Sequence, residues 1–198
     1  MGGINLYERK LAAAEKNLKK SVELQPTHAA YTNLGVLYYR QMRWAESANM
    51  TQKALQLNAK DWRGWLNLGL AYEWLNREAD AAIAYEHQLD CLKELEKIKP
   101  DDAEVQAELG LLHSRKKLRR ETLMYVEAAL ARAPKDPGVL ASVAEAYEYL
   151  GERDRALDLV QQALANGWAL EQLENDPGQR ALVRDPRFRE IARKYKGK

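Results

Sequence analysis

Apolar residues recur along the chain at the spacing of an amphipathic helix, as Leu11, Leu18 and Val22 illustrate near its start. No stretch alternates apolar and polar residues long enough to indicate a β-strand. Pro, Asp and Thr, which favour helix ends and helix starts, cluster between the periodic segments. These clusters lie at 26–27, 59–61, 100–102 and 134–137. The pattern predicts an all-α chain of helices joined by short turns.

The helical pattern repeats with a period of 34 residues. Each copy places an aromatic, a Leu-Gly pair and a Tyr, or their substitutes, at the same internal spacing. The matching residues are, copy by copy, Tyr31, Leu34, Gly35 and Tyr38; Trp65, Leu68, Gly69 and Tyr72; Leu109, Gly110 and His113; and Val143, Ala144 and Tyr147. Such a period is typical of helix-turn-helix repeats that stack into a solenoid.

This pattern resembles the tetratricopeptide repeat (TPR) family over about residues 7–168. The resemblance implies a right-handed α-solenoid of antiparallel helix pairs. It divides the chain into a half-repeat at 1–26, repeats at 28–61, 62–102, 103–136 and 137–168, and capping helices at 169–198. The half-repeat supplies only a second helix, which indicates either an N-terminal cap or a chain cut from a longer protein. The start Met1-Gly2-Gly3 favours the cut.

The second repeat is longer than the others, since Trp62 and Ala103 start consecutive repeats 41 residues apart. Seven extra residues add close to two helical turns and rotate a helix face by only about 20°. The second helix of this repeat can therefore lengthen without losing its packing face, and the sequence predicts one protruding helix over 79–99.

The tail after the fourth repeat carries two Asp-Pro steps, at Asp176-Pro177 and Asp185-Pro186. It is similar to the tails that close repeat arrays in multidomain bacterial serine/threonine kinases and transcriptional regulators. Short helices folded over the last repeat are expected there, because the end of a solenoid otherwise exposes an apolar face.

The composition gives no sign of a nucleic-acid or membrane protein. The chain has 31 basic and 29 acidic residues, a formal net charge of +2, and a single Cys. This balance provides no overall attraction to nucleic acid, and no apolar run approaches the roughly 20 residues that span a bilayer. The compartment stays open, with the cytoplasm favoured.

No sequence motif for catalysis or phosphate binding occurs, so no enzyme activity and no cofactor are expected. His113 takes the place of a packing Tyr and is interpreted as a core residue. His87 and Cys91, four residues apart, offer only two ligands to a metal, so no metal site is predicted. The basic run at 115–120 is interpreted as a solvated turn rather than a phosphate site.

The resemblance also implies a concave groove lined by the first helix of each repeat. The residues expected in this groove are Asn33, Val36, Tyr39, Arg40, Arg63, Asn67, Leu70, Trp74, Glu104, Glu108, Arg115, Glu145 and Tyr149. Asn33 and Asn67 share one repeat position and either form a ladder that holds a peptide backbone or simply occupy a wet helix face. Trp74 is expected to anchor a ligand, whereas Trp44, Trp62 and Trp65 fall at packing positions.

The expected groove is acidic in its second half, where Glu104, Glu108, Glu145 and Glu148 outnumber Arg115. This charge favours a partner with a basic segment and disfavours nucleic acid. The clamp with which some relatives bind a terminal carboxylate is not expected, because Glu104 and Glu108 stand where cations are required.

These features predict a protein-protein interaction module that binds an extended peptide or partner helix. The resemblance of the tail suggests that it is the sensor or scaffold part of a larger bacterial signalling or regulatory protein. The alternative is a self-assembly or spacer domain that pairs through the half-repeat, near 7–22, or through the extended helix at 79–99.

Overall fold

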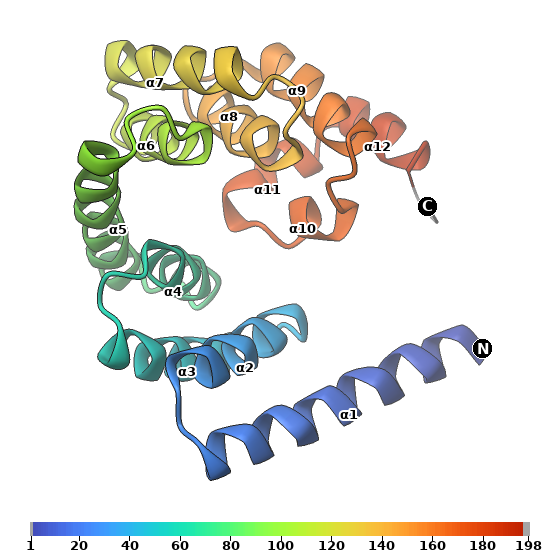
Figure 1. The fold of residues 1–198 in the computed structure, drawn as a ribbon. Helices are drawn as coiled ribbons and strands as arrows, with labels where there is room; N and C mark the ends of the chain where they lie inside the picture. The colour runs from blue at the N-terminus through green and yellow to red at the C-terminus, as the bar shows by residue number, and fades with distance from the viewer. Residues whose placement is uncertain (1, 196–198) are drawn as a thin grey trace. The chain divides into compact units, whose positions relative to one another are not determined.

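The computed structural model describes the backbone of residues 2–195 and the side chains of residues 11–195. All regular structure in this part of the chain is helical (Figure 1). The long helices are α1 Gly2–Leu24, α2 His28–Arg40, α3 Trp44–Leu57, α4 Trp62–Trp74, α5 Glu78–Ile98, α6 Ala103–Arg115, α7 Arg119–Arg132, α8 Pro137–Tyr149 and α9 Arg153–Ala165. The C-terminal segment adds α10 Leu170–Glu174, the 3₁₀ turn η1 Pro177–Gln179, α11 Arg180–Val183 and α12 Pro186–Arg193.

The chain forms two compact units, residues 2–91 and 92–195, and the boundary falls within α5. In the first unit α1 packs on α2, α2 on α3 and α3 on α4. In the second unit α6 packs on α7, α8 packs on α9, and α6 also packs on α8. This succession of antiparallel helix pairs is an all-α solenoid fold, as the repeat period predicts.

An Asp begins the first helix of three repeats. Asp61, Asp102 and Asp136 accept hydrogen bonds from backbone N–H groups in the first turns of α4, α6 and α8. These bonds satisfy donors that have no partner within the helix. The Pro-Asp clusters of the sequence therefore mark helix starts for a direct chemical reason.

The turn inside each repeat has one residue in the left-handed backbone region. These residues recur at equivalent places, Met42 (φ 58°), Asn76 (φ 55°), Lys117 (φ 59°) and Gly151 (φ 79°). In every case the next N–H donates to a carbonyl in the last turn of the preceding helix, as Arg43 does to Tyr38 at 2.9 Å. The shared turn reverses the chain in the same way four times and places the two helices of each repeat side by side.

Close approach of the two helices in a repeat depends on the glycine of the Leu-Gly pair. A Cβ on Gly69 would lie 2.5 Å from the ring of Tyr85 on α5, and one on Gly110 would lie 2.8 Å from Val126 on α7. The recurrence of this glycine in the repeats is thus a packing requirement. The preceding Leu34, Leu68 and Leu109 are all buried, as the repeat pattern predicts.

The lone helix α1 covers one end of the first unit. Apolar residues of α1 pack against buried side chains of α2, and the residues of α1 in this contact are Leu11, Ala14, Leu18 and Val22. Glu15 also accepts a hydrogen bond from Arg43 at 2.8 Å and pairs with Lys19 at 2.7 Å. The side chain of Tyr7, where the expected pairing edge begins, lies outside the described residues.

The extended helix expected over 79–99 is α5, which has 21 residues and runs from Glu78 to Ile98. No helix within residues 2–195 is both long and apolar enough to cross a bilayer.

Candidate functional site

The groove residues expected in the first unit lie on α2 and α4. Asn33, Val36, Arg40 and Arg63 are exposed, while Tyr39, Asn67, Leu70 and Trp74 are half-buried. The two helices contact each other. The first unit therefore brings these eight residues onto neighbouring helices, with side chains at the surface. We refer to them as the α2–α4 face.

Three aromatic side chains meet at the ends of α2 and α4. The ring centroids of Trp44 and Trp74 lie 5.0 Å apart with 7° between their planes, and Tyr39 meets Trp44 edge-on at 4.8 Å. The indole N–H of Trp74 donates a hydrogen bond to the Tyr39 hydroxyl at 3.2 Å. This aromatic cluster (Tyr39, Trp44 and Trp74) is a fixed apolar element of the α2–α4 face, because each ring is held by at least one of the other two.

Trp44 is the residue of this cluster that sequence reasoning assigned to repeat packing. It is the first residue of α3, directly after the turn that follows Tyr39. That turn returns the chain next to the end of α2. The short separation between Tyr39 and Trp44 along the sequence could therefore have indicated that their side chains meet. Half-burial leaves part of the Trp44 side chain at the surface.

The remaining two tryptophans of the first unit pack as predicted. Trp62 is buried. Trp65 stacks on His87 with centroids 4.3 Å apart and donates to the carbonyl oxygen of Ala59 at 2.8 Å.

Burial raises the pKa of the nearby Cys91 thiol. Among the described side chains, no group of three or more His, Cys, Asp or Glu residues is arranged to hold a metal ion.

The groove residues expected in the second unit lie in a different environment. Glu108 and Glu145 are only 6% and 4% exposed. Glu145 forms an ion pair with Arg115 at 2.8 Å, and Glu108 accepts a hydrogen bond from the Ser142 hydroxyl at 2.7 Å. The interpretation of Glu108 and Glu145 as carboxylates that face a ligand is therefore corrected, because both are buried in internal contacts. Of the four acidic residues expected in this half of the groove, only Glu104 is exposed, and Glu148 is half-buried.

Tyr149 and the basic run at 115–120 also belong to this internal network. The Arg115 guanidinium lies 4.8 Å from the centre of the Tyr149 ring, and Lys117 donates to the Tyr149 carbonyl oxygen. Arg119 pairs with Glu152 at 2.5 Å. Lys117 and Arg119 are exposed, as a solvated turn predicts, but three cations of the run also contact the end of α8 and the turn that follows it.

His113 packs against Tyr125 of α7, with nearly parallel rings 5.4 Å apart. Burial, reinforced by Lys93, lowers the pKa of His113 below its usual range. This shift favours the neutral imidazole, which occupies the place of the packing Tyr found in other repeats, as predicted.

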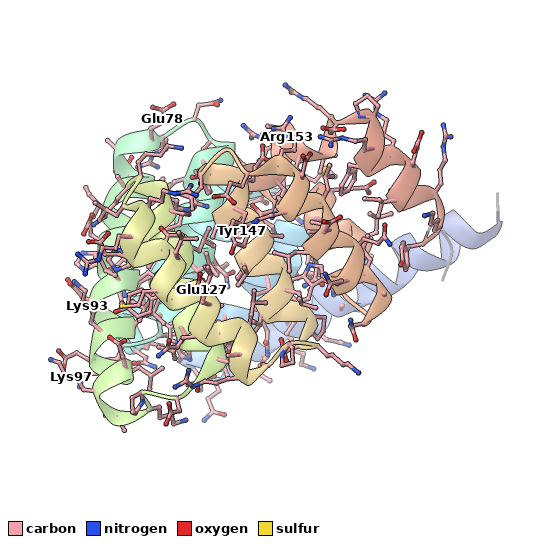
Figure 2. The ribbon with its side chains drawn as sticks, turned by 90° about the horizontal axis from the view of Figure 1, so that it is seen from above. Glu78, Lys93, Lys97, Glu127, Tyr147 and Arg153 are labelled. Carbon is pink, nitrogen blue, oxygen red and sulfur yellow. The ribbon has the colours of Figure 1, made fainter. Side chains whose placement is uncertain are left out.

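The C-terminal helix α12 is fixed to α9 by charged side chains. Arg153, labelled in Figure 2 at the start of α9, pairs with Glu148 and lies 3.9 Å from Asp185. Arg187 bridges Asp185 at 3.0 Å and Asp154 at 2.6 Å. These contacts orient the tail over the fourth repeat.

No family model matches the chain. Solved structures do resemble it. A thermophilic TPR protein of Thermus thermophilus is 21% identical with a TM-score of 0.58, and the match covers 87% of this chain and 93% of that one. A TPR protein from Parabacteroides merdae is 14% identical with a TM-score of 0.61, covering 98% and 74%.

PilF of Pseudomonas aeruginosa is 22% identical with a TM-score of 0.53, and the match covers 98% of this chain and 88% of that one. At these identities the likeness concerns the fold. Together with the repeat period and the helix pairs, it shows that the chain has the tetratricopeptide repeat fold.

Proposed function

We propose that the chain is a protein-interaction module that binds an extended segment of another protein on the α2–α4 face of its first unit. The observation that carries the proposal is the aromatic cluster. The rings of Tyr39, Trp44 and Trp74 are partly exposed and already ordered by one another, so binding costs little additional side-chain entropy. Aromatic side chains of this kind are frequent anchors of protein interfaces.

The amides of Asn33 and Asn67 supply the polar part of this proposal. They occupy equivalent positions on α2 and α4, and an amide can donate to and accept from a peptide backbone at the same time. Each such contact contributes about 1 kcal/mol net. Backbone contacts do not depend on the partner's sequence, so selectivity would come from the residue that packs on the aromatic cluster.

Charge has a smaller role in this proposal than the sequence suggests. The preference for a partner with a basic segment depended on Glu104, Glu108, Glu145 and Glu148, and two of these, Glu108 and Glu145, are buried. The proposed partner is therefore defined by an extended backbone and an apolar or aromatic side chain. The buried carboxylates give no reason to require basic residues in it.

Random peptides displayed on phage and selected on the full chain provide a direct test. Selected peptides should bind Trp74→Ala roughly tenfold or more weakly, since truncating a central aromatic costs more than about 1.4 kcal/mol. Asn67→Ala should weaken binding about fivefold. Gln56→Ala, at an exposed position on α3, is the matched control and should bind as wild type.

The thermal unfolding of each variant is measured alongside, so that lost binding is separated from lost structure. If the selected peptides bind Trp74→Ala and Asn67→Ala as tightly as the wild type, the α2–α4 face is not the binding site. That result would not contradict the assignment of the tetratricopeptide repeat fold, which does not depend on peptide binding.

Self-assembly through α1 has less support than partner binding. Leu11, Ala14, Leu18 and Val22 of α1 pack on α2, and of the larger apolar side chains described on this helix only Leu24, at its end, is exposed. The place of the chain in a larger signalling or regulatory protein stays a prediction that depends on the tail resemblance alone.

A further inference from the structure

Equivalent positions on the first helices of the repeats differ in exposure between the two units. The ninth residue of each of these helices provides the comparison. Val36 on α2 is 40% exposed and Leu70 on α4 is half-buried, whereas Leu111 on α6 and Glu145 on α8 are each 4% exposed. The surface that is open on α2 and α4 is therefore covered on α6 and α8.

The cover over α8 includes the C-terminal segment 175–182. Gly178 of η1 lies directly on Glu145, because a Cβ at Gly178 would overlap the carboxylate and would also lie 3.1 Å from the Tyr149 hydroxyl oxygen. Gly178 does not have a left-handed backbone conformation, so a larger residue here would meet a limit of space and not of backbone strain. A side chain larger than hydrogen cannot be accommodated there without displacing Glu145 or the segment.

The neighbours of Gly178 are also held against the repeats. Pro177 and Gln179 are buried, and Leu182 is buried within the same apolar cluster as Leu111 of α6 and Ala141 of α8. Asp176 orders the turn by accepting a hydrogen bond from the Gly178 N–H at 2.8 Å. The η1 turn contacts α8, and it lies between α10 and α11, which Figure 1 shows in the C-terminal part of the second unit. The segment thus presents a compact Asp-Pro-Gly-Gln turn to the helices.

The surface beneath this turn is polar as well as apolar. The Arg115–Glu145 ion pair and the end of the Tyr149 side chain lie under Gly178. A buried ion pair regains hydration when it is exposed, and this offsets part of the cost of uncovering it. Release of the segment therefore costs less than release of a purely apolar cover of the same size.

We propose that segment 175–182 is an internal ligand of the second unit. It occupies on α8 a surface equivalent to the one that an outside partner is proposed to use on α2 and α4. An outside segment can bind there only when the Asp-Pro-Gly-Gln turn is released, so the tail excludes partners from the second unit. This closure is independent of whether the α2–α4 face binds a partner.

The test uses the full chain with Gly178→Val, which prevents the turn from seating, and a labelled synthetic peptide of residues 171–184. The variant should bind this peptide roughly tenfold or more tightly than the wild type, because the wild-type tail competes at the high effective concentration of a tethered segment. Ala181→Val adds similar bulk at an exposed position of the same segment and should behave as wild type.

A peptide that itself carries Gly178→Val should not bind the variant chain. Equal binding of the native and substituted peptides, or no gain for the Gly178→Val chain, would overturn the proposal. Hydrogen exchange on the wild type decides the matter if Gly178→Val does not fold. Amides at 178–183 should then exchange roughly tenfold or more faster than those in the middle of α8, through local opening. Equal rates would mean that the segment is a permanent part of the core.

Discussion

The indole of Trp44 lies parallel to that of Trp74, and this stacking joins the first residue of α3 to the last residue of α4. The contact connects the second helix of one repeat to the first helix of the next. It also fixes the ring that we propose as the main anchor for a partner. Trp44 therefore has a double role, in the stability of the first unit and in the shape of the α2–α4 face.

Trp44→Ala should lower the free energy of unfolding by about 2 kcal/mol, because it removes a stacked ring and part of a half-buried apolar contact. It should also weaken the selected peptides, since Trp74 loses its support. Denaturant unfolding and peptide binding measure the two effects. Leu57→Ala, at an exposed position on the same helix, should change stability by less than about 0.5 kcal/mol. Equal effects of the two substitutions would contradict the assigned role of Trp44.

The attachment of α1 should depend on pH through Glu15. Hydrogen bonds from Lys19 and Arg43 lower the pKa of Glu15 from 4.5 to about 2 in the folded chain. The folded chain thus holds the proton less readily than the unfolded chain does. The stabilisation is fully present above pH 4.5 and is lost as the pH falls through about 2.

Hydrogen exchange of the α1 amides between pH 4.5 and 2, corrected for the intrinsic rate, measures this effect. Protection should fall with pH in the wild type. In Glu15→Gln it should start lower and change less across the same range. Glu23→Gln, at an exposed position on the same helix, should follow the wild type. A Glu15→Gln chain with the wild-type pH profile would show that the ion pairs do not hold α1.

The repeat period predicted most of the fold because it follows from local chemistry. The burial of Leu34, Leu68 and Leu109 comes from helical periodicity. The length of α5 follows from an insertion of nearly two turns, which preserves the packing face. Both inferences need only the relation of a residue to its neighbours along one helix.

The burial of Glu145 could not be predicted in the same way. A repeat frame gives Glu145 the same assignment as Val36, since both are ninth in their helices. Its burial depends on Gly178, which comes from a tail outside the repeats and reaches α8 only after the chain has turned several times. Contacts of this kind depend on tertiary structure that no periodic pattern encodes.

Adding a single methyl group at the glycine of the Leu-Gly pair should lower the stability of the chain. A Cβ on Gly69 would lie 2.5 Å from the Tyr85 ring, so Gly69→Ala should destabilise the first unit by about 1–3 kcal/mol through overpacking. Gly69→Ala combined with Tyr85→Leu should recover part of the loss, because the smaller side chain makes room. Chemical denaturation of the single and double variants gives the coupling energy. Purely additive effects would mean that the helix contact is not limited by these two residues.

Two substitutions at equivalent left-handed turn positions should change the stability of the chain in opposite directions. Met42 adopts φ 58° with an exposed side chain, and Gly151 adopts φ 79° at the equivalent place. A non-glycine residue in this region costs about 1–2 kcal/mol, whereas glycine costs roughly 0.5–1 kcal/mol through the entropy of the unfolded chain. Met42→Gly should therefore stabilise the chain by about 0.5–1 kcal/mol. Gly151→Ala should destabilise it by a similar amount, since a Cβ there has open space and only backbone strain acts. Thermal unfolding measures both, and shifts of the same sign would mean that the four turns do not share one conformational requirement.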